Sequence, residues 1–153
     1  MMGYLGIAAS ICGTDLIVKE TIQKRVNQHQ KIYTCGDKVI ITKYMNPGAA
    51  LGAFKDRPLL LKGITAFGLG SLMGALAACD GMKGHFLQKL GLSMMLGGAA
   101  SNAKERFCDG EVTDYIQFNF GKSKFRQIVY NIGDFAIFAG GFLVCIGEIA
   151  HKK

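Results

Sequence analysis

The chain has 153 residues, enough for one compact domain, and half of them are hydrophobic. Its mean hydropathy of +0.24 and its 21 glycines are unusual in a water-soluble domain of this size and typical of a small helical membrane protein. The net charge of +7 would suit nucleic-acid binding, but the basic residues lie between apolar segments and form no stripe interleaved with aromatic residues. We therefore expect contact with anionic lipid headgroups and no nucleic-acid partner.

The first apolar segment, residues 2–18, is predicted to be a retained transmembrane helix. It lacks the preceding Lys or Arg and the following cleavage site and soluble domain of a removed secretory signal. Ile11 precedes Cys12, where a lipidation site needs a small residue. Asp15 and Lys19 lie four residues apart near the end of this helix, and an ion pair at the helix end is the favoured interpretation.

A long polar connection, residues 20–57, separates the first helix from the second. The β-branched and aromatic residues at 31–34 and 38–44 flank Cys35-Gly36-Asp37 and predict a β-hairpin. The segment Asn46-Pro47-Gly48-Ala49-Ala50 has turn chemistry followed by small residues. Such a segment lets an extended substrate backbone approach closely, although the pattern alone is not specific.

Three further apolar segments follow, at residues 59–79, 86–102 and 128–150. Each is near the roughly 20 residues that span a hydrocarbon core, although the first and third of the four segments are short. Short apolar runs also form buried helices in soluble proteins, but four in one chain favour a membrane bundle. The predicted fold is all-α and integral to the membrane, with four transmembrane helices in one domain. A small extracytoplasmic β-sheet is expected in the loop between helices 1 and 2.

Connectivity brings the unusual polar residues to one membrane face, because helices joined in sequence alternate in direction. The loops at this face are residues 20–57 and 103–126, and basic residues, among them Lys122, Lys124 and Arg126, are concentrated there. The positive-inside rule alone would place this face in the cytoplasm. Polar groups at membrane depth are costly and usually functional. The candidates at the helix ends are Asp15, Lys19, Asn46, Asn102, Arg106, Asn131 and Asp134.

Two helical faces carry candidate site residues. Gly98, Asn102 and Arg106 recur every four residues; helix packing explains Gly98, but the Asn102 amide needs a polar partner. Asn131 and Asp134 are three residues apart, so the amide can steady the carboxylate. The alternative is a structural Asp134 paired with a basic residue such as Arg106.

Asp114 lies near the point where the chain returns to the bilayer, and alone it would be interpreted as a solvated loop acid. Folded next to Asp134, it would form a pair that cannot easily ionise twice and therefore shares a proton. One carboxylate would then activate water while the other donates a hydrogen bond to the scissile carbonyl. This pattern favours an aspartic protease acting on a lipid-embedded substrate.

The cysteines form no CxxC motif and no Cys/His ligand spacing, so a zinc site is not expected. Cys12, Cys79 and Cys145 fall in apolar segments and are interpreted as small hydrophobic residues. Cys35 and Cys108 fall in polar segments. A disulfide between them is left open, because nothing in the sequence fixes their distance.

Taken in order, the motifs resemble the lipoprotein signal peptidase (signal peptidase II) family over nearly the whole chain. The matching segments are Asp15-Leu16-Ile17-Val18-Lys19, Asn46-Pro47-Gly48-Ala49-Ala50, GGAASNAKER from Gly97 to Arg106, Gly110 to Tyr115, and Asn131-Ile132-Gly133-Asp134.

On this resemblance, Asp114 and Asp134 are the catalytic dyad. The resemblance also implies that substrate is bound, or the dyad supported, by Asp15, Lys19, Asn46, Gly48, Asn102, Arg106 and Asn131. The family cleaves the signal peptide from prolipoproteins just before a diacylglyceryl-modified cysteine, and it needs no metal or other cofactor.

The resemblance further implies a multi-pass protein of the bacterial cytoplasmic membrane, with the active site facing outward and both termini cytoplasmic. We prefer this topology to the loop-charge count, because lysines on the outer surface can serve anionic lipid. The implied partners are the lipid-modified prolipoprotein and membrane lipids, with the family's cyclic-peptide inhibitors as further candidate ligands.

Four residues depart from the family pattern: Glu105 replaces the usual Asp, Gly133 an Ala, Met45 an Arg and Leu51 a Phe. None is in the dyad, but they leave the substrate range and the inhibitor sensitivity open. Two rival functions stay open as well. One is a relative that binds a lipidated peptide without cutting it, and the other is a small transporter or channel subunit lined by the intramembrane polar residues.

Overall fold

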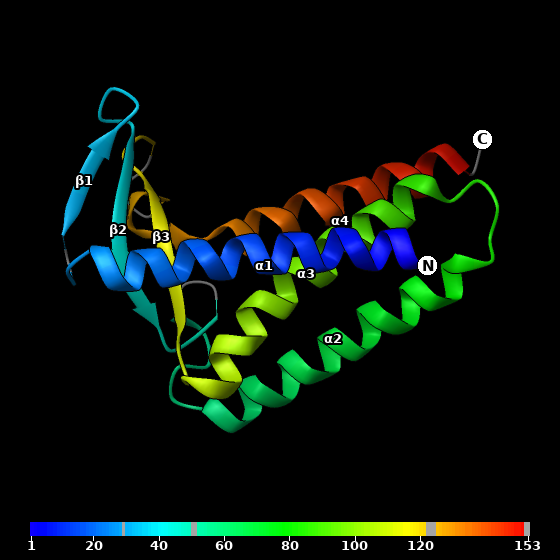
Figure 1. The fold of residues 1–153 in the computed structure, drawn as a ribbon, viewed down its shortest axis with the longest axis horizontal. Helices are drawn as coiled ribbons and strands as arrows, with labels where there is room; N and C mark the ends of the chain where they lie inside the picture. Colours follow the sequence, from blue (N-terminus) through cyan, green and yellow to red (C-terminus); the bar gives the residue numbers. More distant parts are fainter. Residues whose placement is uncertain (29, 50–51, 122–124, 152–153) are drawn as a thin grey trace.

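The computed structural model describes residues 1–28, 30–49, 52–121 and 125–151. Most of the described chain is helical, in α1 (Met2–Arg25), α2 (Pro58–Asp80), α3 (Phe86–Cys108) and α4 (Ile132–His151). The helices run between a small sheet at one end and both chain termini at the other (Figure 1). Of the positions singled out in the sequence, Ala50, Leu51, Lys122 and Lys124 lie outside the described residues.

The sheet has four antiparallel strands in the order β1 (Lys31–Thr34), β2 (Val39–Asn46), β3 (Val112–Phe118) and β4 (Val129–Tyr130). The predicted hairpin is confirmed as β1 and β2. Its turn, Cys35-Gly36-Asp37, has φ angles of 52°, 64° and 60°. All three are in the left-handed region, which matches the twist of tight hairpins.

The expected sheet was wrong in one respect, because it is not confined to the loop between helices 1 and 2. Strands β3 and β4 come from the connection between α3 and α4, where the short 3-10 turn η2 (Phe125–Gln127) also lies. Tyr44 of β2 pairs with Asp114 of β3, and Ile116 of β3 pairs with Tyr130 of β4. Asp114 therefore sits on a strand with hydrogen-bonded neighbours on both sides, and not on a solvated loop.

Helix α3 is the centre of the bundle and packs against α1, α2 and α4. Glycines permit the closest approaches: a methyl group at Gly97 would lie 3.0 Å from the Ala8 Cα atom, on α1. A methyl group at Gly98 would run into the backbone carbonyl of Gly133, on α4. Small residues at helix contacts are the usual means of packing where lipid removes the hydrophobic drive between helices.

The first and third helices run past the ends predicted for the apolar segments. Helix α1 ends only where Val26 adopts an extended conformation (φ −110°, ψ 124°), well beyond residue 18. Asp15 and Lys19 consequently lie within the helix, at 0% and 1% exposure, and not at its solvated end. The limits of the segments inside the membrane stay predictions.

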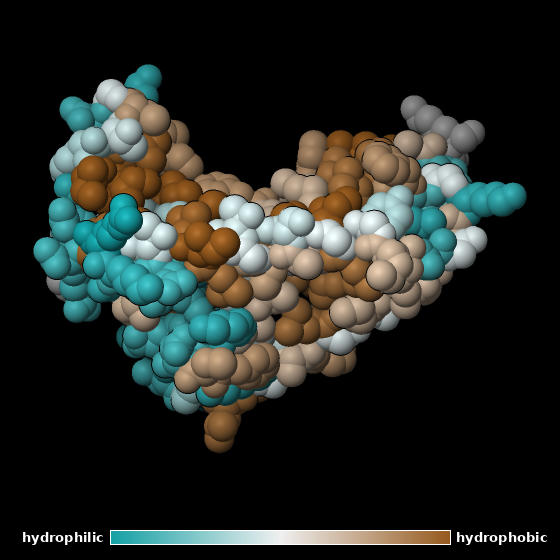
Figure 2. All heavy atoms as spheres, in the orientation of Figure 1, coloured by the Kyte–Doolittle hydropathy of each residue, from teal (hydrophilic) through white to brown (hydrophobic). Residues whose placement is uncertain are grey.

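Two of the helices, α2 and α4, are long and apolar enough to cross a membrane on length and composition. Both expose large apolar side chains, with Leu59 85% exposed on α2 and Phe142 67% exposed on α4. Figure 2 shows apolar surface over the helices, with hydrophilic surface gathered at the sheet end and at the opposite tip. The fold is thus mostly helical and carries a lipid-compatible surface between two polar ends.

Candidate functional site

The start of α4 is fixed by reciprocal hydrogen bonds between Asn131 and Asp134. The Asp134 backbone N–H donates to the Asn131 side-chain oxygen at 2.9 Å, and the Asn131 backbone N–H donates to Asp134 Oδ2 at 3.1 Å. This is the arrangement of a capping box, in which the first and fourth residues satisfy each other's free backbone donors. The Asp134 carboxylate is therefore held in one orientation by the helix start itself.

Asp114 lies across from Asp134 on β3, and one asparagine joins the two carboxylates. The Asn131 Nδ2 atom donates to Asp114 Oδ1 at 2.6 Å, while the same amide accepts from the Asp134 backbone. The other Asp114 oxygen accepts from Asn46 Nδ2 at 2.9 Å. Burial and the nearby Asp134 carboxylate raise the pKa of Asp114 to about 7. A carboxyl group with such a pKa can hold or release a proton near neutral pH.

Asn102 orients the second carboxylate from α3. Its Nδ2 atom donates to Asp134 Oδ1 at 3.0 Å. The orientation of the Asn102 amide group is fixed, because its oxygen accepts a 2.7 Å hydrogen bond from Lys19 Nζ and its nitrogen must then face Asp134. All four carboxylate oxygens of the two aspartates thus accept a hydrogen bond from a side-chain or backbone N–H.

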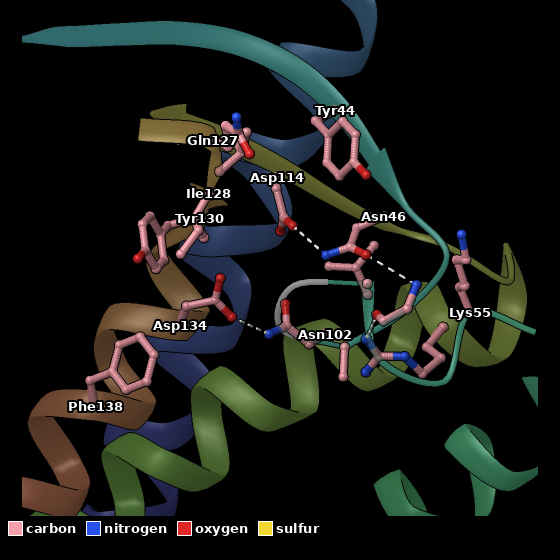
Figure 3. Close-up of a pocket in the computed structure, with 16 residues that line it drawn as sticks. Tyr44, Asn46, Lys55, Asn102, Asp114, Gln127, Ile128, Tyr130, Asp134 and Phe138 are labelled. Atoms are coloured by element: carbon pink, nitrogen blue, oxygen red, sulfur yellow. Dashed lines mark hydrogen bonds between the residues drawn. The ribbon is translucent and has the colours of Figure 1, made fainter. Parts of the chain in front are cut away.

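Both aspartates line one cavity of about 460 Å³ between the sheet, α3 and α4. Figure 3 shows their side chains directed toward the same space, with Asn46 beside Asp114 and Asn102 beside Asp134. The described lining residues are Tyr44, Asn46, Gly48, Ala49, Gly52, Lys55, Asn102, Arg106, Val112, Asp114, Gln127, Ile128, Val129, Tyr130, Asp134 and Phe138.

The loop after β2 is held close to the cavity by Arg106 and by its own turn. Arg106 Nη2 donates to the Gly48 carbonyl at 3.0 Å, and the Gly48 N–H donates to the Asn46 side-chain oxygen at 3.0 Å. A methyl group at Gly48 would lie 2.8 Å from the Ala53 carbonyl oxygen, so this turn requires glycine. The same amide group of Asn46 therefore links the loop to Asp114.

The structure brings most of the candidate site residues together. Asn46, Gly48, Asn102, Arg106, Asp114 and Asp134 line the cavity, and Asn131 lies fully buried behind the two aspartates. Asp15 and Lys19 do not line it; Lys19 lies behind it and donates a hydrogen bond to Asn102. Arg106 donates to Gly48 and Thr65, so it is not the structural partner of Asp134 that the alternative interpretation required.

Glu105 departs from the family pattern, and that departure left the substrate range open, but its side chain does not reach the cavity. It is absent from the cavity lining and is 2% exposed, with its carboxylate directed to Lys19 and Thr113. The sequence also missed the aromatic residues of the cavity: Tyr130 and Phe138 contact each other on one side, and Tyr44 lies on the other (Figure 3). Phe138 lies four residues after Asp134, a spacing that could have indicated a shared helix face.

Among the described residues, the cysteines form no disulfide and the possible metal ligands form no cluster. Cys35 and Cys108 are both free and exposed. Within the described ranges, no three or more His, Cys, Asp or Glu side chains are grouped so as to hold a metal ion.

Comparison with known proteins gives one family by two routes, a family model and individual relatives. The family model of signal peptidase (SPase) II matches residues 7–150. The lipoprotein signal peptidase of Brevibacillus brevis is 30% identical over 153 residues, which is 99% of each chain. The lipoprotein signal peptidase of Moorella thermoacetica is 26% identical over 144 residues, covering 94% of this chain and 91% of the relative.

Two solved structures described as bacterial membrane enzymes share the fold. One has a TM-score of 0.86 at 22% identity and covers all of this chain and 91% of its own. The other has a TM-score of 0.80 at 23% identity and covers 95% of this chain and 92% of its own. Sequence and fold point the same way, and this chain belongs to the signal peptidase II family of bacterial peptidases.

Proposed function

We propose that the chain is an aspartic endopeptidase that removes the signal peptide from diacylglyceryl-modified prolipoproteins, cutting just before the lipidated cysteine. The observation that carries this proposal is the pair Asp114 and Asp134. Both line one cavity, and Asn131 hydrogen-bonds to each of them. Two buried carboxylates so placed supply the acid and the base of peptide hydrolysis.

The chemistry needs the pair to hold one proton. The raised pKa of Asp114, about 7, supports this state near neutral pH. The ionised carboxylate takes a proton from a water molecule, whose oxygen attacks the scissile carbonyl carbon. The protonated carboxyl group donates to the carbonyl oxygen, and the pair then delivers a proton to the departing amine. The water oxygen ends in the new carboxyl group of the signal peptide.

The supporting residues keep both carboxylates in place throughout this cycle. Asn46, Asn102 and Asn131 donate to the aspartates and carry no charge, so they do not compete for the shared proton. Arg106 and Gly48 hold the loop after β2 against the cavity, where an extended substrate backbone is expected to bind.

We propose that all four helices form a single transmembrane domain. At about 1.5 Å per residue, the 23 residues of α3 span ~34 Å, enough for a hydrocarbon core of about 30 Å. Two charged residues within α1, Asp15 and Lys19, are buried and so do not face lipid, while Glu20, Lys24 and Arg25 near the sheet end of the helix are exposed.

In this proposal the sheet and cavity face outward, and both termini are cytoplasmic. The substrate's signal helix enters sideways between helices, and its scissile bond reaches the cavity at the membrane surface. Anionic lipid headgroups contact the basic residues around the sheet. The family's cyclic-peptide inhibitors would occupy the same cavity as the substrate.

The test uses the purified protein, a diacylglyceryl-modified prolipopeptide and its unlipidated twin, with products identified by mass. We expect cleavage only before the lipidated cysteine, and no cleavage by Asp134→Asn. Binding without turnover would favour the non-catalytic relative, and ion flux into liposomes without proteolysis would favour the transporter or channel. Full activity of a folded Asp134→Asn variant would refute the aspartic mechanism.

A further inference from the structure

Behind the two aspartates, Lys19 is buried in a polar cluster between α1 and α3. Its ammonium group is 3.0 Å from Asp15 Oδ2 and 3.1 Å from Glu105 Oε2. It also donates to Asn102 Oδ1 at 2.7 Å and to the Ser101 hydroxyl at 3.1 Å. One buried ammonium therefore bridges two carboxylates and fixes the amide that holds Asp134.

Glu105 ties this cluster to the strand that carries Asp114. Its Oε2 atom accepts from the Thr113 backbone N–H at 3.0 Å, and its Oε1 atom accepts from the Thr113 hydroxyl at 2.7 Å. Gln23 donates to both Glu105 and Thr113, at 3.0 and 2.6 Å. The residue immediately before Asp114 is thus bound to Glu105 through both its backbone and its side chain.

Asp15 makes the corresponding link on the other side of Asp114. The Tyr115 hydroxyl donates to Asp15 Oδ1 at 2.9 Å and accepts from the Ile132 N–H, in the first turn of α4, at 3.1 Å. Burial and the Asp15 carboxylate raise the pKa of Tyr115, so its hydroxyl stays protonated and can donate. Ser101 adds a 2.6 Å hydrogen bond to Asp15.

The geometry of β3 relates the contacts of Thr113 and Tyr115 to the position of Asp114 relative to Asp134. Side chains alternate across a strand, so Thr113 and Tyr115 point away from the cavity while Asp114 points into it. Both neighbours of Asp114 are consequently anchored to carboxylates that Lys19 bridges, and the same Lys19 holds Asn102 against Asp134. A shift in this cluster would alter the positions of both aspartates together.

We propose that Asp15, Lys19 and Glu105 form a positioning cluster that sets the relative placement of Asp114 and Asp134, with Glu105 as the positioning residue for the Asp114 strand. This inference rests on the proposed function. Glu105 does not line the substrate cavity; it lines a separate hollow, together with Lys19, Gln23 and other residues of α1 and α3. Its loss should therefore lower kcat and leave KM nearly unchanged.

The experiment compares Glu105→Gln, Glu105→Asp and the surface control Glu20→Gln by kcat, KM and thermal midpoint. Glu20 is the residue after Lys19 and pairs only with the exposed Lys24 among the described contacts. We expect Glu105→Gln to lose at least tenfold in kcat per folded molecule, because the neutral amide no longer pairs with Lys19 and loses an acceptor for Thr113. Glu105→Asp keeps the charge and should retain clearly more kcat, while Glu20→Gln should match the wild type.

If Glu105→Gln does not fold, Thr113→Val serves instead, since it removes one hydroxyl and keeps the side-chain shape; we expect it to lower kcat at unchanged KM. A lower thermal midpoint with unchanged kcat would show that Glu105 only stabilises the fold, and would overturn the proposal. Equal losses in Glu105→Gln and Glu105→Asp would also overturn it, because the charge would then be irrelevant. A wild-type protein that cuts no lipopeptide refutes the proposed function itself, which is a distinguishable result.

Discussion

Replacing Asn131 by Ser separates two tasks that one buried side chain performs. Ser is a good N-cap residue, so its hydroxyl can still accept the Asp134 backbone N–H, and the start of α4 should keep most of its stability. The shorter side chain cannot reach Asp114, whose Oδ1 atom loses the 2.6 Å hydrogen bond from Asn131 Nδ2. The change therefore removes a donor to one of the two carboxylates proposed to be catalytic while keeping the helix cap.

The expected size of the effect follows from this lost bond. A hydrogen bond to a charged group contributes about 1.5–3 kcal/mol, and 1.36 kcal/mol corresponds to about one pKa unit. The Asn131 bond favours the ionised form of Asp114, so its loss raises the pKa of Asp114 from about 7 by ~1–2 units. Wild-type activity should fall as pH rises through about 7, where the pair loses its shared proton. In Asn131→Ser this fall of activity, the alkaline limb of the pH profile, should occur at higher pH. The maximal rate should also be lower than that of the wild type.

The assay is the pH dependence of kcat with a diacylglyceryl-modified peptide, measured for the wild type, Asn131→Ser and Asn131→Ala. The Ala variant loses the cap as well, so it should show the same pH shift and a further ~0.5–2 kcal/mol loss of stability. An alkaline limb that stays in place, or moves to lower pH, in both variants would refute the assignment of Asn131 as a donor to a catalytic Asp114.

Two further predictions concern packing and topology. Gly133→Ala should destabilise the fold by ~1–3 kcal/mol in chemical unfolding, because its methyl group would lie 2.9 Å from the Gly98 carbonyl oxygen and force α3 and α4 apart. The control is Gly141→Ala on the same helix, where an added methyl group would meet no atom within 4 Å. Equal losses of stability in the two variants would contradict the packing argument. With Cys35 as the sole cysteine, a membrane-impermeant maleimide should label spheroplasts, while Lys83→Cys at the opposite end in a cysteine-free background should react only after permeabilisation. The reverse pattern would place the sheet and cavity in the cytoplasm.

The sequence predicted the helices, the first hairpin and six of the sixteen described residues that line the cavity. The signals for the helices and the hairpin are local. Long apolar runs mark the helices, and the β-branched residues around Cys35-Gly36-Asp37 mark the hairpin. Helix alternation then brings Asn102 and Asp134 to one end without any tertiary information. The approach of Asp114 to Asp134 could be expected only from the family resemblance, since Asp114 by itself has the pattern of a loop acid.

The remaining features depend on pairing between distant segments. Strand β3 joins the sheet by pairing with β2, and no local pattern specifies that partner. The role of Glu105 is similar: its contacts with Lys19 and Thr113 exist only after α1, α3 and β3 meet. Asp15 and Lys19 were interpreted as a helix-end ion pair, and they do pair, but within a buried cluster that the longer α1 creates.

The central claim, that Asp114 and Asp134 are the catalytic pair, is tested most directly by the cleavage rate of Asp114→Asn on a diacylglyceryl-modified peptide, measured beside its thermal midpoint at pH 8. We predict no cleavage above background by a folded variant. Its thermal midpoint should be no lower than that of the wild type, because the raised pKa of Asp114, about 7, means that ionising this buried carboxyl group at higher pH destabilises the fold. A folded Asp114→Asn protein that cleaves the peptide at the wild-type rate would contradict the account.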